Sequence, residues 1–345
     1  MNYGPYIICE GADGTGKTFL ARELERYGFR YVHAGPPEKD ALAYYVRGLR
    51  RLPGLAVADR LHVGSWVYGR AFRNGPDLTD QEEWLFEGYL MARGAVLVYC
   101  SVDPEVIGRN LERGPDSEDA KIYEAPEKRA VLRELYEEFV ARRTALLVVR
   151  YDFTASEDAR TRTASGLVTQ VRNMETLLPR FEVAALGNTQ HPRFIFVGDR
   201  PNRHDAVEKR DRSGEWNGAL VRKFAAIFDN GICWGDSPSG RYLFQCLRAA
   251  GLSLADYCTF NSVQWDGRTV VDLAAEDPKW WHRQTSGADI VALGQLASEQ
   301  LTAAGIPHRR VPHPQYSRRF FYKRVLDYGK LLTGEKEYRD DEWKH

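Results

Sequence analysis

The sequence predicts an α/β protein of two domains, each with a mostly parallel sheet between layers of helices. Three observations support this prediction. Short apolar runs alternate with longer amphipathic stretches on both sides of a break near residue 180, which is typical of βαβ units. The 345 residues exceed the usual size of one hydrophobic core. A glycine-rich turn, Gly11-Ala-Asp-Gly-Thr-Gly-Lys-Thr18, directly follows the first apolar run and has the P-loop spacing.

The first domain is expected to span residues 1–180. Its strands should coincide with the apolar runs, and its helices with stretches in which apolar residues recur every three or four positions. The predicted strands lie at 6–9, 30–33, 55–59, 96–101 and 145–151. The predicted helices lie at about 17–27, 38–50, 78–92, 104–112 and 124–143, with a closing helix at 157–178.

A turn-rich linker is expected at 181–191, followed by the second domain at 192–345. Its predicted strands lie at 194–198, 257–263, 289–294 and near 309–312. Its predicted helices lie near 217–229 and 240–250 and at 295–304 and 316–328. The charged tail from Gly334 is expected to fray.

Composition limits the class of protein. The 48 basic and 48 acidic residues cancel, so any surface that binds nucleic acid must be local. The five cysteines are odd in number and scattered, which favours reduced thiols and a cytoplasmic location, in the host cell if the chain is viral. No apolar stretch approaches the length of a membrane span, and the N-terminus enters a strand within a few residues. We therefore expect neither a membrane anchor nor a signal peptide.

The glycine-rich turn predicts a site for ATP and Mg²⁺. Gly11, Gly14 and Gly16 allow the backbone to turn so that its N–H groups face phosphate oxygens, at the positive end of the next helix. Lys17 supplies a charge for the β- and γ-phosphates, and the Thr18 hydroxyl can hold Mg²⁺.

Three motifs, in the right order, resemble those of the thymidylate kinase family. The segment Glu10-Gly-Ala-Asp-Gly-Thr-Gly-Lys-Thr18 is similar to the family's E-G-x-D-G-x-G-K-T. The run Asp59-Arg-Leu-His-Val-Gly-Ser-Trp-Val-Tyr-Gly69 is similar to D-R-Y-x-x-S-S-x-x-Y-Q. The passage Leu97-Val-Tyr-Cys-Ser-Val-Asp-Pro-Glu105 is similar to L-x-V-D-P-E, which leads to the family's lid. The resemblance covers the first domain and implies a P-loop kinase fold, with a homodimer as one possibility.

The family resemblance suggests roles for several charged residues. Asp59 and Arg60 should lie at the carboxyl end of the third strand, where an open α/β sheet forms its ligand crevice. Arg60 can bind a phosphate, and Asp59 or Asp13 can orient an acceptor hydroxyl. Alternatively, Asp59 organises Mg²⁺ or forms a structural ion pair with Arg60. The P-loop has no arginine of its own, so a lid arginine, Arg109 or Arg113, would stabilise the transferred phosphoryl group; solvated helix arginines are the other interpretation.

Two departures from the family bear on the acceptor. Leu61 replaces the family's tyrosine, and Gly35-Pro36-Pro37 stands where the family has a phenylalanine-proline segment that binds substrate. The acceptor is therefore not necessarily a free nucleotide.

Short motifs of the second domain resemble those of the uracil-DNA glycosylase superfamily in order and spacing. Gly198-Asp-Arg-Pro-Asn202 is similar to G-E-A-P-G, and Ser239-Gly-Arg-Tyr-Leu243 to S-G-x-x-L. A strand ends at Asn261, and His313-Pro-Gln-Tyr-Ser317 is similar to the H-P-S loop that grips DNA. The resemblance covers most of residues 192–325 and implies a three-layer α/β fold that recognises a base extruded from DNA.

In that fold the candidate contacts with DNA or its base are Asp199, Asn202, Trp234, Ser239, Asn261, His313, Arg318 and Arg319. Asn261 would read the base and Trp234 or Phe228 would stack on it, whereas a strand-end turn residue is the other interpretation of Asn261. Six cations and no acid occupy residues 309–324 among aromatic residues. This run is typical of a surface that follows phosphates, or of a solvated amphipathic helix.

The two resemblances together favour phosphorylation of a hydroxylated pyrimidine within DNA. The 5-hydroxymethyluracil DNA kinases of bacteriophages, which resemble thymidylate kinases, act in this way before thymidine is hypermodified. A second hypothesis is a kinase for free dTMP or 5-hydroxymethyl-dUMP with an accessory domain. A third is a DNA glycosylase with a regulatory ATP-binding domain, and a fourth is a DNA-binding module without catalysis.

Overall fold

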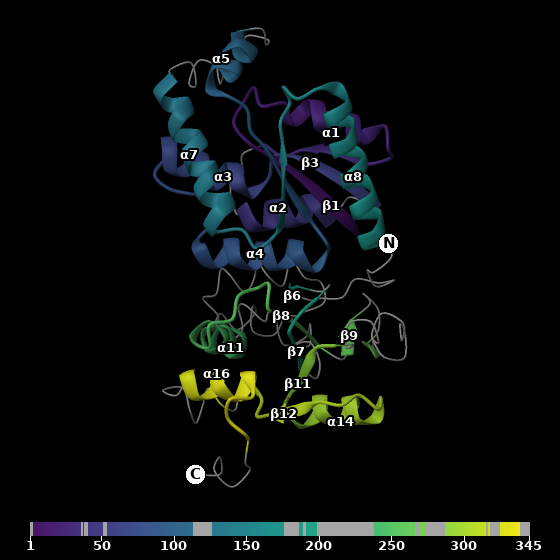
Figure 1. Ribbon diagram of the computed structural model, residues 1–345. Helices are drawn as coiled ribbons and strands as arrows, with labels where there is room; N and C mark the ends of the chain where they lie inside the picture. The colour runs from purple at the N-terminus through teal and green to yellow at the C-terminus, as the bar shows by residue number, and fades with distance from the viewer. Residues whose placement is uncertain are drawn as a thin grey trace, which may run out of the picture. The chain divides into compact units, whose positions relative to one another are not determined.

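The computed structural model describes residues 3–35, 37, 41–50, 54–112, 126–175, 186–188, 191–198, 238–261, 263–265, 270–272, 287–314, 317 and 325–338. The chain forms two compact units, Met1–Leu178 and Pro179–His345. Each unit contains its own β-sheet with helices packed against it (Figure 1). The α/β fold predicted from the sequence is confirmed.

The sheet of the first unit has five parallel strands in the order β2-β3-β1-β4-β5. They are β1 (Tyr3–Glu10), β2 (Arg30–His33), β3 (Gly54–Asp59), β4 (Val96–Cys100) and β5 (Leu147–Tyr151). The central strand β1 pairs with β3, where Cys9 lies opposite Asp59, and with β4, where Glu10 lies opposite Tyr99. Because all five strands run in one direction, their carboxyl ends meet at one edge of the sheet.

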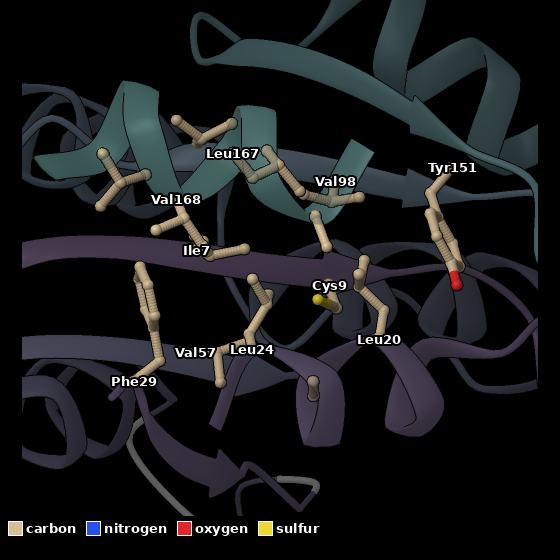
Figure 2. Packing of buried hydrophobic residues seen from close by; sticks show 14 of the residues in the cluster. Ile7, Cys9, Leu20, Leu24, Phe29, Val57, Val98, Tyr151, Leu167 and Val168 are labelled. Carbon is tan, nitrogen blue, oxygen red and sulfur yellow. The ribbon is translucent and has the colours of Figure 1, made fainter. Parts of the chain in front are cut away.

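One face of this sheet is covered by α1 (Lys17–Glu25) and α8 (Glu157–Glu175). Figure 2 shows Leu20 and Leu24 of α1 and Leu167 and Val168 of α8 packed around Ile7 of β1. None of these five side chains is more than 6% exposed. This core explains why the apolar positions of α1 and α8 recur every three or four residues.

A second group of helices packs together through aromatic rings. It consists of α2 (Ala41–Arg50), α3 (His62–Phe72), α4 (Asp80–Ala92) and α7 (Pro126–Arg142). Tyr45 of α2 stacks on Phe86 of α4 at 5.7 Å, and Trp66 of α3 meets Phe139 of α7 at 5.4 Å. Figure 1 shows α3 and α7 on the side of the sheet away from α1 and α8. A shorter helix, α5 (Pro104–Glu112), follows β4.

Helix α3 was not expected from the sequence, which suggested only a motif there. The residue at its N-cap position is Leu61, which has no side-chain oxygen to cap the helix. The first turn is capped instead by Glu10, more than 50 residues earlier in the chain. A local reading of the sequence cannot detect such a cap.

The second unit has a five-stranded sheet in the order β12-β11-β7-β8-β6. The strands are β6 (Leu186–Gly187), β7 (Phe194–Gly198), β8 (Tyr257–Asn261), β11 (Asp289–Leu293) and β12 (Arg309–Val311). All neighbours are parallel except β6, which runs antiparallel to β8. The segment expected to be a linker therefore contributes a strand to this sheet.

The other described elements of this unit are three helices and a small hairpin. The helices are α11 (Pro238–Ala249), α14 (Gln295–Ala303) and α16 (Val325–Thr333), and the hairpin joins β9 (Val263–Trp265) to β10 (Val270–Asp272). Helix α16 continues five residues beyond the predicted helix at 316–328. The helix predicted near 217–229 lies outside the described residues. Among the described helices of both units, none has the length and apolar character needed to cross a bilayer.

Candidate functional site

A cavity of about 410 Å³ lies at the carboxyl edge of the first sheet. It is bordered by the P-loop, the ends of β2 and β3, helix α5 and the loop after β5. Its lining residues are Asp13, Gly14, Gly16, Lys17, Thr18, Phe19, His33, Asp59, Arg60, Asn110 and Phe153. Most of the residues predicted for catalysis and nucleotide binding in this domain therefore border one space, namely Asp13, Gly14, Gly16, Lys17, Thr18, Asp59 and Arg60.

The P-loop glycines adopt backbone conformations that other residues avoid. Gly11, Gly14 and Gly16 have φ angles of 150°, 77° and 84°. A Cβ atom on Gly11 would lie 2.2 Å from the carbonyl oxygen of Cys100, so this residue also lets the loop pass close to β4. Gly16 is the N-cap of α1, and it borders the cavity together with Lys17 and Thr18 of the first turn, so the start of this helix lies at the cavity, the usual arrangement for phosphate.

Lys17 is buried at the base of the cavity, with 5% of its side chain exposed. Its Nζ donates to the carbonyl oxygen of Ala12 at 2.6 Å and lies 3.7 Å from Oδ1 of Asp13. Burial lowers the pKa of Lys17, and the negative charge of Asp59 acts in the opposite direction. The amine is thus held inside the loop at the position where the phosphate-binding motif requires it.

Oxygen atoms from β3 and α1 converge beside Lys17. The hydroxyl of Thr18 donates to Oδ2 of Asp59 at 2.6 Å, and the hydroxyl of Tyr31 donates to the same oxygen at 3.1 Å. Burial, followed by the charge of Asp59, raises the pKa of Tyr31 to about 12, so the phenol remains a donor. Nδ1 of His33 lies 3.9 Å from this carboxylate.

The donor set fits Mg²⁺, a hard cation that prefers oxygen. Thr18 and Asp59 would hold it, together with phosphate oxygens and water. No cluster of three or more His, Cys, Asp or Glu side chains suited to a metal occurs in the described part of the chain.

Arg60 does not pair with its neighbour Asp59 as one sequence interpretation suggested. Its guanidinium forms an ion pair with Oδ1 of Asp13 on the P-loop. The Tyr68 hydroxyl lies 3.5 Å from the other oxygen of Asp13, and the Tyr68 ring lies 5.5 Å from the guanidinium carbon. The motif residues Asp13, Arg60 and Tyr68 therefore form one cluster at the rim of the cavity.

Only one of the two predicted lid arginines, Arg109, lies in the described part of the chain. Arg109 lies exposed on α5 and does not border the cavity, while Arg113 lies outside the described residues. The next residue after Arg109, Asn110, does border the cavity and donates through Nδ2 to the carbonyl oxygen of Gly14 at 2.7 Å. This contact was not predicted from the sequence, and no local pattern indicates it.

Phe153 is a second residue that was not predicted from the sequence. It follows β5, borders the cavity beside Gly16, and meets Phe19 edge to face at 5.3 Å. The guanidinium of Arg160 lies over both rings, at 5.3 and 5.6 Å. Phe153 follows a strand that ends at the ligand-binding edge of the sheet, and this position is the signal from which it could have been predicted.

The second unit brings some of its predicted residues to one edge as well. Gly198 at the end of β7 pairs with Asn261 at the end of β8, and the N–H of Gly294 donates to the carbonyl oxygen of Val311 at 2.9 Å. His313 follows β12, and its Cβ lies 3.2 Å from where a Cβ on Gly294 would be. The carboxyl ends of four parallel strands thus carry Gly198, Asn261, Gly294 and His313.

The remaining candidates of this unit are less completely described. Ser239 lies in the first turn of α11. Asp199, Asn202, Trp234, Arg318 and Arg319 lie outside the described residues. Their predicted roles stay predictions.

No protein-family model matches the sequence, and no curated protein matches it. Solved structures give fold-level matches. YorR from Bacillus subtilis, in complex with phosphorylated GDP, has 21% identity and a TM-score of 0.39, over 48% of this chain and 95% of that chain. Deoxyadenosine kinase from M. mycoides with bound dATP has 14% identity and a TM-score of 0.35, over 48% and 99%. Chaetomium thermophilum Kti12 in complex with ADP-AlF3 has 17% identity and a TM-score of 0.33, over 48% and 99%.

Matches with TM-scores this low carry no argument about activity. The strand order, the glycine conformations and the P-loop cavity of the chain itself carry the assignment. On that basis the first unit is an α/β domain with a P-loop.

Proposed function

We propose that this protein transfers the γ-phosphoryl group of ATP to the hydroxymethyl oxygen of 5-hydroxymethyluracil in DNA. The observation that carries the kinase part is the cavity in which Lys17, Thr18, Asp59, Arg60 and Asp13 come together. The DNA acceptor rests on the resemblance of the second unit and on the departures of the first unit from the thymidylate kinase pattern.

Each side chain has its own role in the proposed transfer. Lys17 and the loop N–H groups bind the β- and γ-phosphates, and Mg²⁺ bound beside Thr18 neutralises charge on them. The acceptor is a hydroxyl, which must lose a proton as it attacks phosphorus. Asp13 is 25% exposed and Asp59 only 2%, so Asp13 is the more accessible of the two carboxylates proposed to orient that hydroxyl.

The second unit is proposed to bind the DNA. Asn261 and His313 occupy carboxyl ends of parallel strands, which is where open α/β sheets bind ligands. Under this proposal Asn261 reads the extruded base, and the basic residues that follow β12 contact backbone phosphates.

The test is a labelling experiment with the full chain. The protein is incubated with γ-labelled ATP and duplexes that differ only in the substituent of one thymine (hydrogen, methyl or hydroxymethyl), and in parallel with free dTMP and 5-hydroxymethyl-dUMP. The DNA is then digested and the labelled nucleoside is identified. Label is expected in the phosphorylated 5-hydroxymethyl-2′-deoxyuridine recovered from the duplex, and it should be lost in Lys17→Ala.

Label only in the free nucleotides would refute the DNA acceptor and favour a monophosphate kinase. Abasic sites without transferred label would favour a glycosylase. DNA binding with no loss of γ-phosphate from ATP would indicate a module without catalysis.

A further inference from the structure

Glu10, the last residue of β1, is a buried carboxylate that no step of the proposed transfer uses. It is 1% exposed. Its Oε1 accepts the N–H groups of Leu61 at 2.7 Å and Val63 at 3.1 Å, and its Oε2 accepts the N–H of Gly64 at 3.1 Å. These are the N–H groups at the start of α3, which lack partners within the helix. Glu10 therefore caps α3 from the neighbouring strand.

The residue just before this cap has an unusual backbone. Arg60 has a φ of 71°, and it is the one residue other than glycine with a positive φ in the described part of the chain. Such a conformation is unfavourable for a residue with a Cβ atom. The N–H of Arg60 donates to the carbonyl oxygen of Cys9 at 3.0 Å, and the next N–H donates to Glu10. Two hydrogen bonds from consecutive N–H groups to β1 thus offset the strain of the left-handed conformation.

The left-handed turn decides where the guanidinium of Arg60 lies. Arg60 forms an ion pair with Asp13 on the P-loop and borders the cavity. Released from the turn, its backbone would return to a commoner region of φ and ψ, and the side chain would leave the cavity from a different angle. Helix α3, which carries Tyr68 beside Arg60, depends on the same carboxylate for its cap.

We infer that Glu10 is a positioning residue for phosphoryl transfer, which keeps Arg60 in its left-handed conformation and its guanidinium against the P-loop. The inference rests on the proposed phosphoryl transfer but not on the identity of the acceptor. Glu10 does not border the cavity, so it acts through Arg60.

The variant Glu10→Gln keeps the size of the side chain but turns one acceptor oxygen into a donor facing an N–H group. Its effect is measured alone and combined with Arg60→Ala. The readout is the single-turnover rate at which ATP loses its γ-phosphate, to water or to any acceptor, with the protein in excess and at a concentration that binds all the ATP. The affinity for ATP is measured separately. A small displacement of a reacting group can cost about 10²-fold in rate. We expect a loss of that order in the wild-type background, little change in ATP affinity, and no further loss in the Arg60→Ala background.

Two more variants keep the test decisive. Glu82→Gln is the matched control, because Glu82 is also a buried carboxylate that caps a helix, α4, away from the cavity. It should lower the free energy of unfolding without lowering the rate. Gly64→Ala places a Cβ 3.3 Å from Oε2 of Glu10 and displaces the carboxylate slightly, so it decides the question if Glu10→Gln does not fold. Its smaller rate loss should also disappear when Arg60 is alanine.

An equal loss of rate in both Arg60 backgrounds would overturn the inference, as would a fully active Glu10→Gln protein. Absence of any ATP cleavage by the wild-type chain would instead refute the kinase assignment and the inference with it. Cleavage without transfer to DNA would refute only the DNA acceptor.

Discussion

Gly16 and Gly28 have similar positive φ angles, 84° and 90°, but different surroundings. A Cβ on Gly28 meets nothing within 4 Å. A Cβ on Gly16 would lie 2.6 to 2.8 Å from three atoms of the Phe153 side chain. Substitution by alanine at both positions therefore separates the cost of a left-handed residue from the cost of a collision.

The left-handed conformation alone costs alanine about 1–2 kcal/mol, which is the full expectation for Gly28→Ala. Overpacking adds about 1–3 kcal/mol at Gly16 because the nearest atom is the Phe153 Cβ, which cannot move by rotation of the ring alone. Gly16→Ala should therefore lose about 2–5 kcal/mol, the sum of the two costs. It should also weaken ATP binding, since the N–H groups of the loop move with it.

The assay is urea-dependent hydrogen exchange on the full chain, read by mass spectrometry on peptides of β1 and α1, which reports the first unit separately from the second. A double-mutant cycle with Phe153→Gly, which removes all three obstructing atoms, should recover the excess loss. Equal losses for Gly16→Ala and Gly28→Ala, or an excess that persists without the Phe153 side chain, would refute the steric reasoning.

Two further predictions concern buried polar contacts. Burial by itself lowers the pKa of His62, but the hydrogen bond to Glu87 and the nearby carboxylates outweigh it, so the pKa is raised. Because the folded pKa exceeds the unfolded value of about 6.5, the stability from this pair is complete below about pH 6.5 and is lost as the pH rises through the folded pKa. His62→Gln should remove that decline from urea-denaturation profiles measured from about pH 6.5 upwards, and parallel profiles for the two proteins would contradict the reasoning. The Asn110→Ala variant loses the hydrogen bond to Gly14 that fastens the P-loop to α5, worth about 0.5–1.5 kcal/mol. Its affinity for ATP, measured by titration calorimetry, should fall by about 2- to 10-fold, and an unchanged affinity would show that the contact is dispensable.

The sequence predicted those strands, turns and helices whose own residues carry the signal for them. The sequence around β1, the P-loop and α1 carries its own strand, glycine and helix signals, and those elements form close to the predicted residues. Helix α3 escaped prediction because its cap comes from Glu10 on another strand. Strand β6 has only two residues and forms by pairing with β8, which no periodicity of its own can indicate.

The candidate site was predictable to a similar degree. The motif spacing identified Lys17, Thr18 and Asp59, and the strand order explains why they meet at one edge. The pairing of Arg60 with Asp13 was not predictable, because it depends on a left-handed residue that no local pattern gives reason to expect. Contacts such as the one from Asn110 to the P-loop arise only when distant elements pack.

The ion pair between Asp13 and Arg60 also bears on the choice of acceptor. Arg60 is the one arginine among the described residues that border the cavity, and its guanidinium is already matched by a carboxylate. A free nucleoside monophosphate would bring about two negative charges next to those of ATP and would compete with Asp13 for Arg60, whereas a neutral hydroxyl brings none. Asp13→Asn keeps the side chain's size and removes the carboxylate charge that faces the guanidinium.

This variant should therefore bind free dTMP about tenfold more tightly than the wild type, since a hydrogen bond to a charged group contributes about 1.5–3 kcal/mol and this one is partly exposed. Transfer to the hydroxymethyl group should fall, because the carboxylate that orients the hydroxyl is gone. Equilibrium titration with dTMP and the labelling assay measure the two effects, with Asp77→Asn as a control that alters an Arg73 pair just beyond the end of α3 instead. If Asp13→Asn weakens dTMP binding and leaves DNA phosphorylation intact, Asp13 neither competes with a free nucleotide for Arg60 nor orients the hydroxyl, and the role proposed for Asp13 is wrong.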